Sequence, residues 1–136
     1  MKRYASLSVL ACLGFAVAAP LSGPGTAYAA EEQPAKPVYI SLGEFTINLP
    51  LKGGLMAYAI IGITIDANPA AATDLRAVEP RLKEMVMRRL MAMADSGVLQ
   101  PEHTDLAAVK QALVSSIAKL QPDSVRDVLI VRLLYG

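Results

Sequence analysis

The one histidine of the chain is the first candidate for chemistry, because imidazole is the side chain that most often acts as a general base near neutral pH. His103 lies between Glu102 and Thr104 and two positions before Asp105, so a carboxylate is close enough in sequence to orient the ring. A base also needs a nucleophile or a metal to act upon, and the spacing places neither beside it. We interpret His103 as a solvated loop or helix-cap residue. The sequence predicts no catalytic residue, metal or cofactor, and a hydrolase or metal enzyme is the least favoured class.

The chain also contains six methionines, whose thioethers can form a soft-metal site or an adaptable binding surface. Met85 and Met93 fall on the apolar stripe of a predicted helix, so we expect them in the core. Met87 and Met91 are one helical turn apart and lie beside basic residues of that helix, which favours a contact with another molecule. The surface predicted to contact a partner consists of Arg81, Met87, Arg88 and Met91.

The charge of the chain gives little information about partners. The basic residues of this helix interleave with Glu79 and Glu84, which is typical of a solvated face, although an anionic partner or a lipid surface is the alternative. The whole chain has thirteen basic and twelve acidic residues. Without Lys2 and Arg3 the net charge falls to about minus one, which does not indicate a nucleic-acid partner.

The first residues have the pattern of an export signal. Lys2 and Arg3 precede an apolar run from Leu7 to Ala19, and the triplet Ala27-Tyr28-Ala29 has small residues where a signal peptidase requires them. We predict a signal peptide over residues 1–29, cleaved between Ala29 and Ala30. A short membrane anchor is the alternative, but thirteen helical residues span only about 20 Å of a hydrocarbon core of about 30 Å.

Cysteine usage supports the same picture. Cys12 is the only cysteine, and it lies inside the predicted signal, where a lipoprotein processing site is a weaker interpretation. The mature chain then has no disulfide, so its apolar core must hold the fold. Residues 30–37 are polar with two prolines, which predicts a linker.

The domain over residues 38–136 begins with two predicted strands. Apolar residues alternate from Val38 to Leu49 with a slip of one residue at Gly43, which predicts a bulged strand with one buried face. Gly53-Gly54 lacks the lysine, hydroxyl and helix of a phosphate loop and is interpreted as a turn. The run from Leu55 to Asp66 is apolar on both faces and rich in β-branched residues, which favours a central strand over a buried helix. Gly62 is expected to leave room for a neighbour.

Two helices and a third strand follow. Thr73-Asp74 is predicted to cap a helix that ends near Ser96-Gly97, and Pro80 either kinks it or lies in the first turn of a second segment. Thr104 is predicted to cap the next helix, which ends before Pro122. Residues 125–135 alternate as another strand that is apolar on both faces. The predicted fold is therefore α+β in the order β-β-α-α-β, a small antiparallel or mixed sheet with two helices on one face.

Four stretches together resemble the flagellar basal-body-associated FliL family. They are Tyr39 to Leu49 with its Phe45-Thr46-Ile47-Asn48-Leu49 core, the strand Tyr58 to Asp66, the helix start Pro80-Arg81-Leu82-Lys83-Glu84, and the strand Val125 to Tyr135. The resemblance implies an exported, non-enzymatic domain, similar in fold to the stomatin-type scaffold domain, at the periplasmic face of the inner membrane. It implies association with flagellar stator and basal-body proteins, and assembly into homo-oligomers.

Two features depart from that family. Its members usually carry a full-length transmembrane helix, whereas the apolar run here is short, and the chain ends Leu133-Leu134-Tyr135-Gly136 where the family often ends near a glutamine. No terminal contact is therefore carried over to this chain. An alternative function of another class is a periplasmic carrier that holds a small molecule or lipid between sheet and helices, which requires an internal apolar pocket of several hundred Å³.

Overall fold

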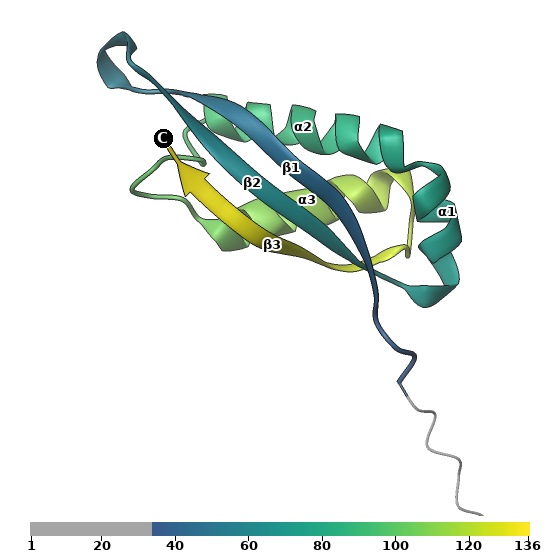
Figure 1. Cartoon of the computed structure of the whole chain (residues 1–136). Coiled ribbons are helices and arrows are strands. Elements are labelled where there is room, and N and C mark those ends of the chain that lie inside the picture. The colour runs from purple at the N-terminus through teal and green to yellow at the C-terminus, as the bar shows by residue number, and fades with distance from the viewer. Residues whose placement is uncertain (1–33) are drawn as a thin grey trace, which may run out of the picture. The chain divides into compact units, whose positions relative to one another are not determined.

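A computed structural model describes residues 34–136 of the chain (Figure 1). The predicted signal peptide, its Ala29–Ala30 cleavage site and Cys12 lie outside the described residues. Residues 34–37 are exposed and without regular secondary structure, in keeping with the linker prediction. The elements are β1 (Val38–Pro50), η1 (Lys52–Gly54), β2 (Met56–Ala67), η2 (Pro69–Ala71), α1 (Ala72–Ala77), α2 (Glu79–Asp95), α3 (Leu106–Leu120) and β3 (Val125–Tyr135).

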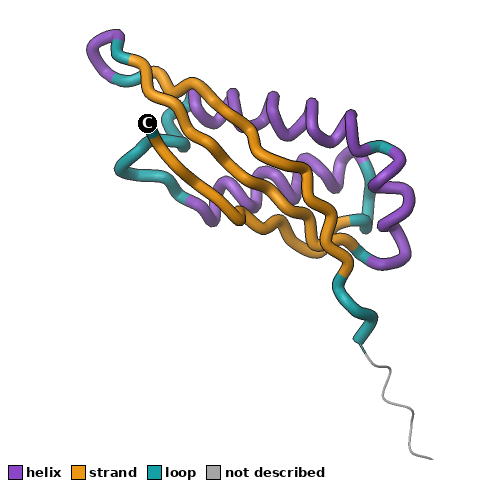
Figure 2. Tube along the Cα trace, in the orientation of Figure 1, coloured by secondary structure: helices purple, strands orange, loops and turns teal. Residues whose placement is uncertain are grey.

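The three strands form one antiparallel sheet in the order β1-β2-β3, and both long helices cover the same face (Figure 2). Helix α2 packs against β1, α3 packs against β3, and the helices pack against each other. The predicted α+β class with two helices on one face is confirmed. The open question of an antiparallel or mixed sheet is settled as antiparallel, with β2 central as predicted.

The bulge predicted in the first strand is confirmed. The pairing of β1 with β2 shifts between Ser41 and Gly43, and Gly43 has a φ of 90°, which favours glycine. Because Leu42 is the extra residue, the apolar side chains on both sides of the bulge face the helices. Phe45 and Ile47 are 5% and 2% exposed. The strand thus keeps one buried face over its whole length.

The start of the helical region settles the choice that Pro80 left open. A short helix, α1, ends at Ala77, and α2 begins at Glu79 with Pro80 in its first turn, where the missing N–H costs little. Neither α1 nor α2 has a side-chain cap, so the predicted cap at Thr73-Asp74 is wrong. A hydrogen bond from the Ala70 N–H to the Asn68 side chain, at 3.3 Å, caps the preceding 3-10 turn instead.

The other helix ends are partly as predicted. Helix α2 ends at Asp95, and Gly97 has a φ of 77°, in agreement with the predicted stop at Ser96-Gly97. The predicted Thr104 cap of α3 is wrong: Asp105 is the capping residue and accepts a hydrogen bond from the Ala108 N–H at 3.0 Å. The Thr104 hydroxyl instead donates to the Gln100 carbonyl at 2.6 Å and is hydrogen-bonded to the Tyr135 hydroxyl.

The third strand has the predicted limits but not the predicted burial. Its pairing with β2 shifts between Gly62 and Ile63. Alternation of residues along the sequence therefore does not show correctly which side chains of β3 face the helices. Val131 is the extra residue at this shift and is 65% exposed, and Leu134 is 45% exposed. The strand lies at the edge of the sheet and is not buried on both faces, because no helix among residues 34–136 covers the second face.

The core fills the space between the sheet and the helices. The largest side chains with less than 2% exposure are Ile47, Leu49, Ile61, Ile63, Ile65, Leu75, Leu82, Leu90, Leu99, Leu113, Ile117 and Val86. They come from every major element except β3, whose Val128 is also fully buried. Within residues 34–136, none of the helices has the length and apolar character needed to cross a membrane.

Candidate functional site

Helix α2 carries all four residues of the predicted partner surface, so the site is built from this helix outward. Leu82, Val86 and Leu90 repeat every four residues and are fully buried. This spacing fixes one face of the helix on the core and leaves two flanks beside it. One flank borders α3 and the other borders β1, and each is hollowed into a groove open to solvent.

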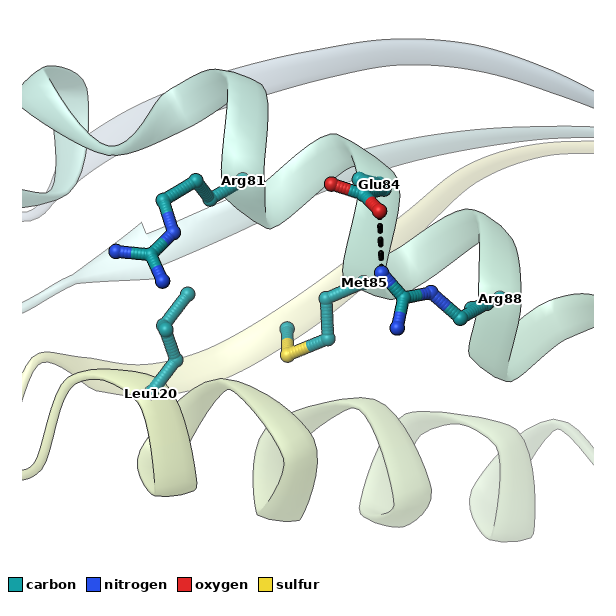
Figure 3. Close-up of a pocket in the computed structure, with 5 residues that line it drawn as sticks. All are labelled: Arg81, Glu84, Met85, Arg88 and Leu120. Atoms are coloured by element: carbon teal, nitrogen blue, oxygen red, sulfur yellow. Dashed lines mark hydrogen bonds and ion pairs between the residues drawn. The ribbon is translucent and has the colours of Figure 1, made fainter.

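The groove between α2 and α3, called here the arginine groove, has a volume of about 230 Å³. Its lining residues are Arg81, Glu84, Met85 and Arg88 of α2 and Leu120 of α3. Figure 3 shows Met85 extending from α2 toward α3, Leu120 directed from α3 toward the end of the Arg81 side chain, and Arg88 lying along α2 beside Glu84. The groove therefore combines an apolar floor with two guanidinium groups at its rim.

The charges of this groove are only partly compensated. Arg88 forms an ion pair with Glu84 one turn earlier, and both side chains are well exposed at 75% and 68%. Lys83 pairs with Glu79 at 2.7 Å on the neighbouring surface. Arg81 has no ion pair within residues 34–136. The interleaved acidic residues thus neutralise part of the helix, and one guanidinium at the groove remains available to an anion.

The groove between α2 and β1, called here the methionine groove, is larger, at about 490 Å³. Its lining residues are Thr46, Ile47, Asn48 and Pro50 of β1, Met56 of β2, and Met87, Met91 and Asp95 of α2. Met56 is 65% and Met91 is 53% exposed. Met91 and half-buried Met87 are the two methionines that the helical pattern left outside the core, and tertiary folding brings Met56 of β2 into the same groove.

The predicted partner surface is therefore divided in two. Arg81 and Arg88 line the arginine groove, whereas Met87 and Met91 line the methionine groove on the opposite flank of α2. Sequence reasoning missed Leu120, Thr46 and Asn48 as groove residues, because they come from elements distant in the chain. It placed Met93 in the core correctly, at 5% exposure, but Met85 is half-buried and forms part of a groove floor.

His103 is exposed in the loop before α3, as its interpretation as a solvated residue requires. It lines an open hollow of about 610 Å³ together with residues of the β1–β2 turn. Its backbone N–H donates to the Gln100 carbonyl at 3.3 Å. Over the described part of the chain, no three histidine, cysteine or acidic side chains are grouped so as to hold a metal ion.

The carboxyl group of Asp127 has a lowered pKa. The Lys110 ammonium donates to Asp127 at 2.9 Å, and this hydrogen bond lowers the pKa of Asp127, with a further lowering from the Val128 N–H at 2.8 Å and from the Lys110 charge. Partial burial opposes the shift. The pair joins α3 to β3, and neither residue lines one of the grooves described here, so we interpret it as a structural contact.

Comparisons of the sequence with models of protein families and with curated proteins gave no match.

Proposed function

We propose that this protein is a non-catalytic accessory of the flagellar motor, a periplasmic scaffold that associates with basal-body and stator proteins and with copies of itself. Its place is the periplasm or the periplasmic face of the inner membrane. The proposal rests on the order and spacing of the stretches that resemble the FliL family, from Tyr39 to Tyr135. The stomatin-like character of the domain is part of the same proposal, and the antiparallel β-β-α-α-β arrangement is compatible with it.

The single observation that favours a scaffold over a carrier is the filled interior. Side chains of both helices and of the sheet with less than 2% exposure meet between the two layers, where a carrier would hold its ligand. The hollows beside α2 are open grooves on the surface. Open grooves suit contacts with segments of other proteins, whereas small-molecule sites bury most of the ligand.

The arginine groove is the part of this surface that we assign to an acidic partner segment. The Arg81 guanidinium can bind a carboxylate bidentately, Arg88 adds positive charge beside it although it is paired with Glu84, and the floor of Met85 and Leu120 can receive an apolar side chain. Such a partner combines acidic and apolar residues on one face. The four-residue partner surface of the sequence prediction is thereby reduced to Arg81 and Arg88 for this contact.

Motility in a strain that lacks the gene tests the proposal. We expect intact flagella but slower swimming, with the largest defect in viscous medium, where the motor carries the highest load. Complementation with Arg81→Glu combined with Arg88→Glu should fail to restore swimming, whereas Arg76→Glu on α1, away from the groove, should restore it. Unchanged swimming of the deletion strain at every viscosity would contradict the motor assignment.

A further inference from the structure

The outer edge of β1 has main-chain groups that the sheet does not use. Tyr58 and Gly136 exchange N–H···O bonds of 2.9 and 3.1 Å, so the main chain of Tyr58 is directed at β3. The turn between β1 and β2 closes with a hydrogen bond of 2.9 Å from the Leu51 N–H to the Leu55 carbonyl. The main-chain groups of Leu51 therefore face β2, as do those of every second residue before it on this part of β1. In an antiparallel ladder successive residues face opposite sides. Thr46 and Asn48 therefore direct both their N–H and their C=O away from β2.

This stretch of edge is neutral and bordered by a groove. From Phe45 to Pro50 no side chain is charged. The nearest carboxylate on the strand, Glu44, is already paired with Arg132 at 2.7 Å. Thr46 and Asn48, whose outward main-chain groups have no partner within residues 34–136, also line the methionine groove. Open backbone groups and an open groove thus coincide at one place.

A second copy of the chain does not fit this edge as a continuous sheet. Paired strands lie about 4.8 Å apart, whereas packed helices need about 8–10 Å between their axes. Because α2 packs against β1 itself, pairing β1 with β1 of another copy would bring the two α2 helices to roughly the strand spacing. An occupant without its own helical layer on that face avoids the clash.

We propose that β1 binds an extended peptide segment of a partner protein, which adds as a fourth strand along Thr46 and Asn48. Its side chains alternate between the two faces. Those on the helical face contact Met87 and Met91, whose flexible thioethers adapt to varied apolar shapes. Those on the other face lie beside Thr46 and Asn48.

The charge of the groove specifies one further property of the segment. Asp95 is the only charged residue that lines the methionine groove, and it is exposed. A lysine or arginine near one end of the segment would complement it. The segment is thus apolar at alternate positions with a basic residue at one end, which differs from the acidic partner assigned to the arginine groove. This inference concerns the edge of the sheet and does not rest on the motor assignment.

Amide hydrogen exchange of the full-length protein tests the proposal directly. The probes are two capped six-residue peptides that alternate threonine with leucine, one with lysine at its N-terminal end and one with lysine at its C-terminal end, so that both strand directions are covered. We expect at least one peptide, at saturation, to slow exchange of the Thr46 and Asn48 amides by about tenfold or more, while Ile47 and Leu49 change little because they are already bonded to β2. The same peptides N-methylated at alternate residues should give no protection.

Variants of the protein provide a second test of the same proposal. Asn48→Pro removes the outward N–H and should abolish binding, whereas Asn48→Ala keeps it and should bind as the wild type does. Asp95→Lys should weaken binding of the lysine peptide by about two- to fivefold, and Asp74→Lys on α1 should leave its affinity unchanged.

Three results would overturn the proposal. The first is no binding of either peptide at millimolar concentration. The second is binding without protection of Thr46 and Asn48. The third is protection of these amides that depends on protein concentration alone, which would show a second copy as the occupant. None of these measurements involves a motor protein, so failure here is distinguishable from failure of the motility test.

Discussion

The two edge strands, β1 and β3, border the same sheet but are built differently. Strand β1 contributes five buried apolar side chains, Ile40, Leu42, Phe45, Ile47 and Leu49, whereas β3 contributes only Val128. The pairing of β3 with β2 has two register shifts, and the Lys110–Asp127 pair at 2.9 Å joins the strand to α3. Bulges and charges are the devices that protect sheet edges from further pairing. β1 has one bulge, at its other end, and an uncharged edge from Phe45 to Pro50.

The two edge strands therefore differ in the contacts that hold them to the rest of the fold. Strand β1 is held by apolar burial on its inner face, so its edge does not need charged side chains for stability. Strand β3 is held by fewer buried side chains, by an irregular pairing with β2 and by an ion pair to α3. The regular, uncharged end of β1 is therefore the better edge for a partner strand.

The largest expected effect comes from core truncation on the two strands. Ile47→Ala should lower the free energy of unfolding by about 2–5 kcal/mol, because the side chain is fully enclosed and leaves a cavity. Leu133→Ala on half-buried β3 should cost about 1–2 kcal/mol, since less apolar surface is lost. Urea unfolding followed by circular dichroism measures both variants. Equal losses would show that the two strands are anchored alike.

A smaller effect is expected at Gly62 of β2, where side chains of β3 approach the backbone closely. A Cβ added at Gly62 would lie 3.0 Å from the Arg132 Cβ and 3.1 Å from the Val131 Cγ2. The Arg132 Cβ cannot rotate away from its own backbone, so Gly62→Ala should shift β3 and cost about 1–3 kcal/mol.

A double variant separates this contact from a general effect of alanine in a strand. Val131→Ala added to Gly62→Ala should recover part of the lost unfolding free energy, because it removes one of the two clashing atoms. Thermal or urea unfolding of the four combinations gives the coupling. Strict additivity would show that β3 adjusts without contact between these residues.

The Lys110–Asp127 pair should make a modest, pH-dependent contribution. Hydrogen bonding to Lys110 lowers the pKa of Asp127 in the folded state, so the stabilisation is present above the unfolded pKa and is lost as pH falls through the folded one. Asp127→Asn should cost about 0.2–1 kcal/mol at neutral pH, since the two side chains are 36% and 44% exposed. Urea titrations at several pH values should show the difference from wild type beginning to shrink below about pH 4 and disappearing only below the lowered pKa of folded Asp127. A difference that persists unchanged in acid would assign the loss to packing.

The smallest effect is expected for the Glu44–Arg132 pair, which connects the two edge strands across Gly62. Both side chains are about half exposed, at 52% and 53%, so Glu44→Gln should cost only about 0.2–0.5 kcal/mol. The cost should vanish near 1 M salt, where the screening length is about 3 Å. A salt-independent loss in the same unfolding assay would indicate a hydrogen-bond or packing role.

Sequence patterns predicted the elements well because each depends on neighbours along the chain. The period-two runs gave β1, β2 and the limits of β3, and the slip at Gly43 located a bulge that needs a positive φ. Capping was predicted less well. Thr104 has a suitable hydroxyl, but its bonds to Gln100 and Tyr135 engage it elsewhere, so Asp105 caps α3.

The grooves could be predicted only in part. Helical spacing indicated which arginines and methionines of α2 avoid the core, but it did not show that they lie on opposite flanks. That division depends on which neighbour lies beside each flank, and the neighbours, Leu120 and the edge of β1, are distant in sequence.

The sequence by itself determined the order of the elements, the buried faces of β1 and of the two long helices, and the types of residue left for contacts, because hydrophobic periodicity and turn residues act locally. The tertiary structure alone decided that β3 is an exposed edge with a shifted register, that Met56 joins Met87 and Met91, and that Thr46 and Asn48 have outward main-chain groups. These features arise from pairing between distant segments. The free energy that each of these features gains or costs depends on contacts between distant segments, which a local sequence pattern does not specify.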